Sequence, residues 1–160
     1  MSMLIMPFSA IQEAGVTELI GVDEKVDQND YCGSVAITLA ALCSGEILSV
    51  CFYSTEDGTG GVQQCEGWLY FFDANPAIAS GDTTITAAAR VTVLGRVKLE
   101  STDWEADTNG ATAYIYDTPV PFHSLSTIYV AFKLTSATSL NDAAGDDEQL
   151  EVNFWYRRDS

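Results

Sequence analysis

The chain has 160 residues, enough for one ordinary domain with a hydrophobic core of its own. Seven Lys and Arg residues face 23 Asp and Glu residues, and the net charge of −16 argues against binding to nucleic acid, whose phosphates such a surface repels. The composition is 47% hydrophobic, yet no apolar run reaches the ~18 residues of a membrane helix, so we expect neither a disordered chain nor a membrane protein.

The first ten residues, M-S-M-L-I-M-P-F-S-A, contain no basic residue and no A-x-A-like cleavage site, so they do not resemble a signal peptide. We interpret residues 1–10 as a candidate N-terminal arm and residues 11–160 as a single domain. In an arm of this kind, Leu4, Ile5 and Phe8 would contact a partner, for example by adding a strand to the edge of its sheet. An ordinary first strand of the domain is the equally weighted alternative.

Apolar residues that alternate with polar ones predict eight strands, separated by turn-forming clusters that include C-S-G at 43–45 and Y-D-T-P-V-P at 116–121. In one of these strands the apolar face consists of Val91, Val93, Val97 and Leu99. The predicted strands cover residues 16–22, 35–42, 46–53, 67–73, 90–100, 111–117, 127–135 and 149–157. One short helix is expected over residues 83–89, with Asp82 as its N-cap. The residues expected to face the core in the last two strands are Ile128, Val130, Phe132, Leu134, Leu150, Val152, Phe154 and Tyr156. This pattern favours an all-β, jelly-roll-like β-sandwich, with an eight-stranded barrel as the alternative.

The segment G-W-L-Y-F-F departs from this alternation, because Trp68 to Phe72 are apolar or aromatic on both faces of the predicted strand. Both faces of such a strand must be covered. One face is expected to fill the core, formed either by Leu69 and Phe71 or by the three aromatic residues that alternate with them. The other face is expected to meet a long connection of the chain or a neighbouring copy, and we favour the copy.

Three basic and two aromatic residues are further candidates for a contact surface. Arg90, Arg96 and Lys98 are predicted to share one face of a strand, where we expect them to pair with the chain's own carboxylates or, alternatively, with an acidic partner. Trp104 stands in the polar sequence T-D-W-E-A-D, and Trp155 alternates away from the core-facing residues of its strand. Both tryptophans are therefore predicted to be exposed, where they could stack on a sugar or contact a protein.

Catalytic and metal-binding patterns give no positive evidence. No G-x-S-x-G motif surrounds a serine, so we interpret His123, the single histidine, as a packing residue at a loop edge. The four cysteines match no usual zinc spacing, and we expect reduced thiols. These cysteines are Cys32, Cys43, Cys51 and Cys65. Cys51 lies in an apolar strand and is expected in the core.

The acidic segments are weak candidates for other chemistry. The sequence E-A-D-T-N-G at 105–110 begins like a calcium loop but lacks the glutamate that must end one. The loop 141–148 is interpreted as solvated, with loose binding of a hard cation as the alternative. A carboxylate pair for glycoside hydrolysis is uninformative, because 23 acids would form some suitable pair in almost any fold. We therefore expect no enzyme, no cofactor and no metal.

Four segments, taken in order, carry a resemblance to a known family: L-Y-F-F-D-A-N-P, A-A-R-V-T-V-L-G-R-V-K-L, V-P-F-H-S-L-S-T-I-Y-V-A-F-K-L and the final L-E-V-N-F-W-Y-R. Over roughly residues 16–158 their pattern and order resemble a family of small tailed-phage virion proteins. The order of the segments carries the resemblance, and no single motif does. It implies a β-sandwich head protein that decorates or cements the capsid and has no catalytic residues.

We therefore predict a structural virion protein on the outer surface of a phage head, assembled in the host cytoplasm and bound non-covalently to the major capsid protein lattice. A homo-oligomer is also expected, with a trimer favoured. The alternative is a tail, fibre or baseplate component, or a carbohydrate-binding module that uses exposed tryptophans. The candidate interface residues are Leu4, Ile5, Phe8, Trp68, Tyr70, Phe72, Arg90, Arg96, Lys98, Trp104 and Trp155.

Overall fold

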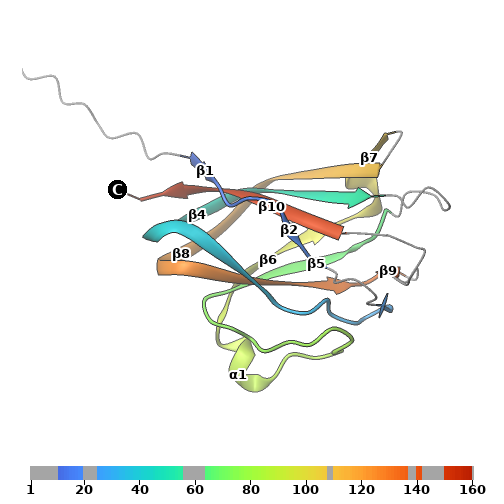
Figure 1. Ribbon diagram of the computed structural model, residues 1–160, viewed down its shortest axis with the longest axis horizontal. Helices are drawn as coiled ribbons and strands as arrows, with labels where there is room; N and C mark the ends of the chain where they lie inside the picture. The colour runs from blue at the N-terminus through green and yellow to red at the C-terminus, as the bar shows by residue number, and fades with distance from the viewer. Residues whose placement is uncertain are drawn as a thin grey trace, which may run out of the picture.

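The computed structural model describes residues 11–19, 25–55, 64–107, 110–136, 140–141 and 150–159. These residues form a fold built almost entirely of antiparallel strands (Figure 1). The strands are β1 (Ile11–Glu13), β2 (Thr17–Glu18), β3 (Lys25–Val26), β4 (Val35–Thr55), β5 (Gly67–Phe72), β6 (Val93–Leu99), β7 (Trp104–Asp107), β8 (Gly110–Leu134), β9 (Leu140–Asn141) and β10 (Leu150–Arg158). The helical elements are α1 (Ala87–Arg90) and the 3-10 turn η1 (Ser101–Asp103). The candidate residues Leu4, Ile5 and Phe8, and the acidic residues 142–148, lie outside the described residues.

Two long strands, β4 and β8, organise the fold. They pair with each other along most of their length, but the register is interrupted between Thr38 and Cys43 of β4. Both strands fold back at this point, so the first and second halves of each strand run in different layers (Figure 1). Each long strand therefore contributes to both layers of a β-sandwich.

The two layers are named here after one strand that belongs to each. The β10 layer contains residues 45–55 of β4 and 110–122 of β8, flanked by β10 with β1 and β2 on one side and by β7 on the other. The β5 layer contains residues 35–38 of β4 and 127–134 of β8, followed by β5 and then β6. The short strands β3 and β9 pair separately.

The core lies between these layers and is joined by aromatic rings. Phe52 of the β10 layer meets Phe132 of the β5 layer with ring centroids 5.8 Å apart, and Phe71 meets Phe154 edge-on at 5.6 Å. Burial of each large apolar side chain contributes about 1.5–3 kcal/mol. The residues predicted to face the core in the last two strands are all buried: Ile128, Val130, Phe132, Leu134, Leu150, Val152, Phe154 and Tyr156. The predicted all-β sandwich is confirmed.

Two of the predicted turns are wrong, because the strands continue through them. C-S-G lies inside β4, where a Cβ on Gly45 would stand 2.1 Å from the carbonyl oxygen of Arg157. This glycine therefore permits the close approach of β10 and does not form a turn. Y-D-T-P-V-P lies inside β8 and forms a bulge beside Leu48, in which Asp117 adopts a φ of 57°. Aspartate tolerates this left-handed conformation better than most residues.

The helix is shorter and begins later than predicted. Its N-cap is Thr86, whose Oγ1 accepts the backbone N–H of Ala89 at 3.1 Å. Asp82, the predicted cap, instead accepts a backbone N–H of the preceding turn at 2.8 Å. Val91 was expected to face the core, but it follows the helix and is exposed, because β6 begins only at Val93.

The aromatic strand β5 is covered on both faces. Leu69 and Phe71 point into the core and are fully buried. Phe72 points to the other side, where it packs with Tyr31 and with Ile78 of the connection that leads to α1. The favoured expectation, cover by a neighbouring copy, is therefore wrong at Phe72, because the chain supplies this cover itself.

Candidate functional site

The outer face of the β10 layer carries a pair of exposed aromatic rings from β8. In the sequence A-T-A-Y-I-Y, Ala111 and Ala113 turn inward and are buried, whereas Tyr114 and Tyr116 turn outward with 49% and 70% of their surface exposed. The two rings lie nearly parallel, with centroids 6.2 Å apart and an interplanar angle of 11°. Exposure of this much aromatic surface is typical of a contact site.

The register of the strands places further aromatic residues beside this pair. Tyr116 lies opposite Ser49 of β4, and on the other side of Ser49 lies Trp155 of β10, which is partly exposed. Tyr53 of β4 points to the same outer face two outward rows beyond Ser49, with the row of Cys51 and Tyr114 between them. We call Tyr53, Tyr114, Tyr116 and Trp155 the tyrosine face.

Cys51 lies beneath the tyrosine face. Its neighbours Val50 and Phe52 belong to the core, so the thiol points to the opposite side of β4, yet it is fully buried. The side chains of Tyr53 and Tyr114 hydrogen-bond to it. Burial raises the pKa of the Cys51 thiol, and the hydrogen bond to Cys51 raises the pKa of Tyr53. The neutral thiol is therefore favoured, and its Sγ donates to the carbonyl oxygen of Phe52 at 3.8 Å.

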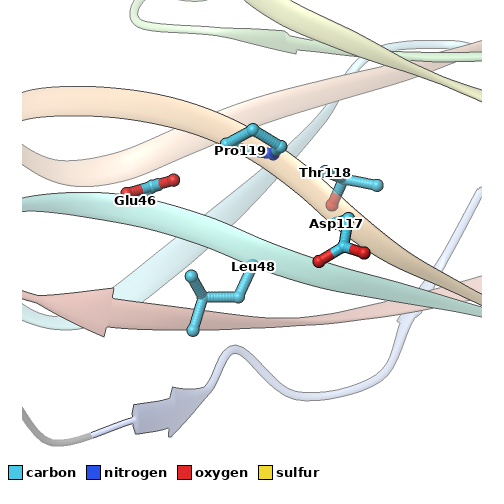
Figure 2. Close-up of a pocket in the computed structure, with 5 residues that line it drawn as sticks. All are labelled: Glu46, Leu48, Asp117, Thr118 and Pro119. Carbon is cyan, nitrogen blue, oxygen red and sulfur yellow. The ribbon is translucent and has the colours of Figure 1, made fainter.

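A groove of about 510 Å³ adjoins the tyrosine face at the bulge of β8 (Figure 2). It forms because three residues of β8 stand beside a single residue of β4, which widens the gap between the strands. Figure 2 shows the lining side chains where β4 and β8 run side by side. They are Glu46 and Leu48 of β4 and Asp117, Thr118 and Pro119 of β8.

The groove contains oxygen acceptors on both of its strands. Glu46 Oε2 accepts a hydrogen bond from Arg157 Nη2 of β10 at 2.9 Å, an ion pair within the chain. The hydroxyl of Thr118 is buried and has no hydrogen-bond partner among the described residues. Asp117 is exposed. A ligand with several N–H donors would match this arrangement.

The surrounding outer face is acidic. Four glutamates on the strands at both sides of the tyrosine face point outward. Their direction follows from the strand register, because each is paired with a residue that lies on the outer face. These glutamates are Glu13, Glu18, Glu105 and Glu151. The nearby Arg157 is already paired within the chain. This face is therefore a negatively charged aromatic surface.

The predicted residues Trp68, Tyr70 and Arg96 come together on the opposite, outer face of the β5 layer. The Arg96 guanidinium carbon lies 4.0 Å from the centroid of the Trp68 ring, and Arg96 Nη1 donates a hydrogen bond to the Tyr70 hydroxyl at 3.2 Å. Both aromatic side chains are partly exposed. The cation therefore covers aromatic surface of its own chain.

The remaining predicted residues are dispersed. Trp104 is buried and its Nε1 donates a hydrogen bond to the carbonyl oxygen of Cys65 at 2.8 Å, so the prediction that it is exposed is wrong. Lys98 is exposed on β6 and pairs with Glu100 of its own chain. Arg90 is exposed but lies in α1, so it does not share a strand face with the other two cations as predicted. Phe72, fully buried, is not available to a partner in this fold.

His123 lies on β8 where the long strands fold back, and the expectation of a loop edge is wrong. Its Nδ1 stands 2.9 Å from the hydroxyl oxygen of Ser44 in β4. That oxygen also accepts the backbone N–H of Ser124 at 2.9 Å. Ser124 has a φ of 51°. The contact fastens β4 to β8 at the fold-back.

No protein-family model matches the chain, and no curated protein matches it either. Within the described ranges, no three His, Cys, Asp or Glu side chains are grouped so that they could hold a metal ion. All four cysteines lie in these ranges, buried and without disulfides, which gives no support to a four-thiolate zinc site. Among the described helices, none is long and apolar enough to cross a membrane.

Of the tyrosine face, only Trp155 was among the candidate residues predicted from sequence, and none of the groove residues was. The alternation of alanine with tyrosine before Asp117 contained a usable signal, because it places bulky aromatic residues where a polar face is expected. No comparable local pattern in the sequence predicted the groove. It depends on a bulge that brings Glu46 and Leu48 beside residues about 70 positions later in the chain.

Proposed function

We propose that this protein is a structural component of a tailed-phage particle that decorates or cements the outer surface of the head. It binds the major capsid protein non-covalently and catalyses no reaction. The proposal is supported by the order of the four sequence segments that resemble small virion proteins, and by an all-β sandwich that is compatible with such a role.

The observation that carries the proposal is the exposed tyrosine face. Tyr114 and Tyr116 present broad, rigid rings on the outer face of the sheet, near the half-buried Leu48. Aromatic residues are enriched at protein interfaces, because they bury a large area while fixing few rotatable bonds. The high negative charge would keep the free protein soluble until it meets its site on the lattice.

Cryo-electron microscopy of the particle whose genome encodes this chain tests the proposal. We expect density for the sandwich at regular positions on the outer shell, with the β10 layer toward the capsid protein. Density on the tail alone, or no density on the particle, would overturn the head assignment.

Self-association is part of the same proposal, with a trimer as the favoured state. Ile11 and Val16 are exposed apolar residues beside the N-terminal segment, which contributes Leu4, Ile5 and Phe8 as further contact candidates. Light scattering after size-exclusion chromatography should therefore give a trimer for the full chain and a smaller species after deletion of residues 1–10. A full chain that remains monomeric at micromolar concentration would exclude self-association.

A carbohydrate-binding role in a tail or fibre is the second candidate. The observation in its favour is the pair of parallel rings of Tyr114 and Tyr116 with carboxylates nearby, since aromatic faces stack on sugars and carboxylates accept their hydroxyl groups. Trp104, one of the two tryptophans predicted to stack on a sugar, is buried. A glycan array with Tyr116→Ser as the control decides the matter, because a sugar ligand should bind the wild type and not this variant.

A further inference from the structure

We propose that the tyrosine face and the adjoining groove dock a basic protein segment, with an arginine side chain placed between the Tyr116 ring and the carboxylate of Asp117. The inference rests on the proposed function and specifies the chemistry of the partner: a cationic patch on the surface of the lattice protein. It commits to that occupant over a sugar or a second copy of this chain.

The charge of the face determines which partner can approach it. Carboxylates from β1, β2, β7, β10 and the β8 bulge surround the tyrosine rings, whereas Glu46 of β4 and Arg157 pair with each other. A second copy would bring its own net charge of −16 to the same face and would be repelled. A basic partner is attracted, and electrostatic complementarity also accelerates its association.

The other face of the molecule shows how this chain accommodates cations on aromatic rings. Arg96 lies 4.0 Å from the Trp68 centroid, and the Lys133 ammonium lies 5.0 Å from the Tyr31 centroid. In the described parts of the chain, no basic side chain lies over Tyr114 or Tyr116. On the β5 layer, the aromatic rings already contact cations of the chain. On the β10 layer, the rings of Tyr114 and Tyr116 are open to a cation from a partner.

The groove supplies oxygen acceptors for the N–H donors of the arginine side chain. Asp117 is exposed beside Tyr116, and the Thr118 hydroxyl is an acceptor without a described partner. Glu46, which also lines the groove, already accepts a hydrogen bond from the Arg157 guanidinium at 2.9 Å, so a carboxylate of this face binds a guanidinium within the chain itself. A guanidinium matches the site better than an ammonium does, because it is planar enough to stack on a ring and carries a fork of donors for carboxylate oxygens.

A nuclear magnetic resonance titration of the full chain with a hexa-arginine peptide tests the docking site without the particle. We expect the largest shifts at residues 46–49 and 114–119, and at least tenfold weaker binding for Tyr116→Ser and for Asp117→Asn. Asparagine also tolerates the φ of 57°, so Asp117→Asn retains the bulge. Asp73→Asn, at an exposed position just after β5, is the matched control and should bind like the wild type.

The same variants separate this inference from the proposed function. Shifts spread evenly over the acidic surface, or equal losses for Asp73→Asn and Asp117→Asn, would overturn the docking site. Particles that lack the protein are then mixed with purified chain. Failure of the wild type to bind them would overturn the head role, even where the peptide result supports the site. Binding by wild type, Tyr116→Ser and Asp117→Asn to the same extent would support the head role and overturn the docking inference.

Discussion

The indole of Trp104 anchors the start of β7, because its ring is buried in the core and its N–H reaches the carbonyl oxygen of Cys65. Trp104→Phe would remove this buried hydrogen bond and leave a gap where the larger indole packs, so it should lower the free energy of unfolding by about 1–3 kcal/mol. Urea denaturation followed by circular dichroism measures the loss. Trp155→Phe, at a partly exposed position, is the control and should change stability by less than about 1 kcal/mol. Equal stability of the two variants would contradict the anchoring role.

Tyr31 links the stability of the fold to alkaline pH. Burial, followed by the interaction with Tyr70, raises the pKa of Tyr31 from 10.0 to about 12. A group whose pKa is higher in the folded state stabilises the protein fully below its unfolded pKa, and this contribution is lost as the pH rises toward 12. We therefore expect the free energy of unfolding to fall by on the order of 2 kcal/mol between pH 9 and pH 12 from this group.

The comparison with Tyr31→Phe isolates this contribution from other alkaline effects. Phenylalanine does not ionise, so the variant should show a shallower decline in urea midpoint over the same range. Parallel curves for wild type and variant would show that the buried tyrosine does not titrate as described.

Among the strands, the contact between β4 and β10 depends on the absence of a side chain at Gly45. A methyl group there would meet the Arg157 carbonyl oxygen at 2.1 Å, so Gly45→Ala must separate the two strands at the fold-back. We expect a loss of about 2–4 kcal/mol, within the range of severe core and backbone substitutions. Gly33→Ala is the matched control, because its new methyl group would have no described neighbour closer than 3.6 Å. Thermal unfolding should rank Gly45→Ala far below Gly33→Ala.

The elements that sequence predicted well are those in which one local pattern decides the outcome. Strict alternation in β10 and in the second half of β8 identified every core-facing residue there. The predicted strand boundaries failed where Gly45 and the segment around Asp117 used turn-forming residues for a close approach and a bulge. Both features depend on a partner strand far away in sequence, so no local pattern could distinguish them from turns.

The same distinction explains what could be predicted of the candidate site. The outward position of Tyr114 and Tyr116 follows from the alternation within β8 and was accessible to sequence reasoning. The burial of Trp104 was not, because its polar neighbours in sequence suggested exposure, whereas its hydrogen-bond acceptor lies 39 residues earlier. The groove required the register between β4 and β8, which only the fold supplies.

For the molecule as a whole, the two outer faces of the sandwich differ in what covers them. On the β5 layer, the connection through Ile78 packs over Phe72, and Arg96 lies over Trp68. On the β10 layer, Tyr114 and Tyr116 remain exposed among carboxylates. Cation–aromatic contacts thus lie on the β5 layer, whereas around Tyr114 and Tyr116 the β10 layer is acidic and aromatic, with Arg157 paired to Glu46. We expect this difference to orient the molecule toward a basic surface.

The net charge of −16 predicts opposite effects of salt on folding and on docking. Repulsion among 23 acidic side chains opposes the compact state, and raising NaCl from 10 mM to 1 M shortens the screening length from about 30 Å to about 3 Å. The melting temperature should therefore rise by several degrees over this range. Attraction between the tyrosine face and a basic lattice is screened by the same ions, so binding to particles should weaken at least tenfold.

Calorimetry and a sedimentation assay on the same salt series measure these two effects. KCl in place of NaCl should reproduce both curves, because screening depends on ionic strength and not on the cation. If salt left particle binding unchanged while the melting temperature rose, the contact would be apolar, and the acidic rim of the tyrosine face would serve solubility alone. A melting temperature independent of salt would instead show that the carboxylates lie too far apart on the folded surface to repel one another appreciably.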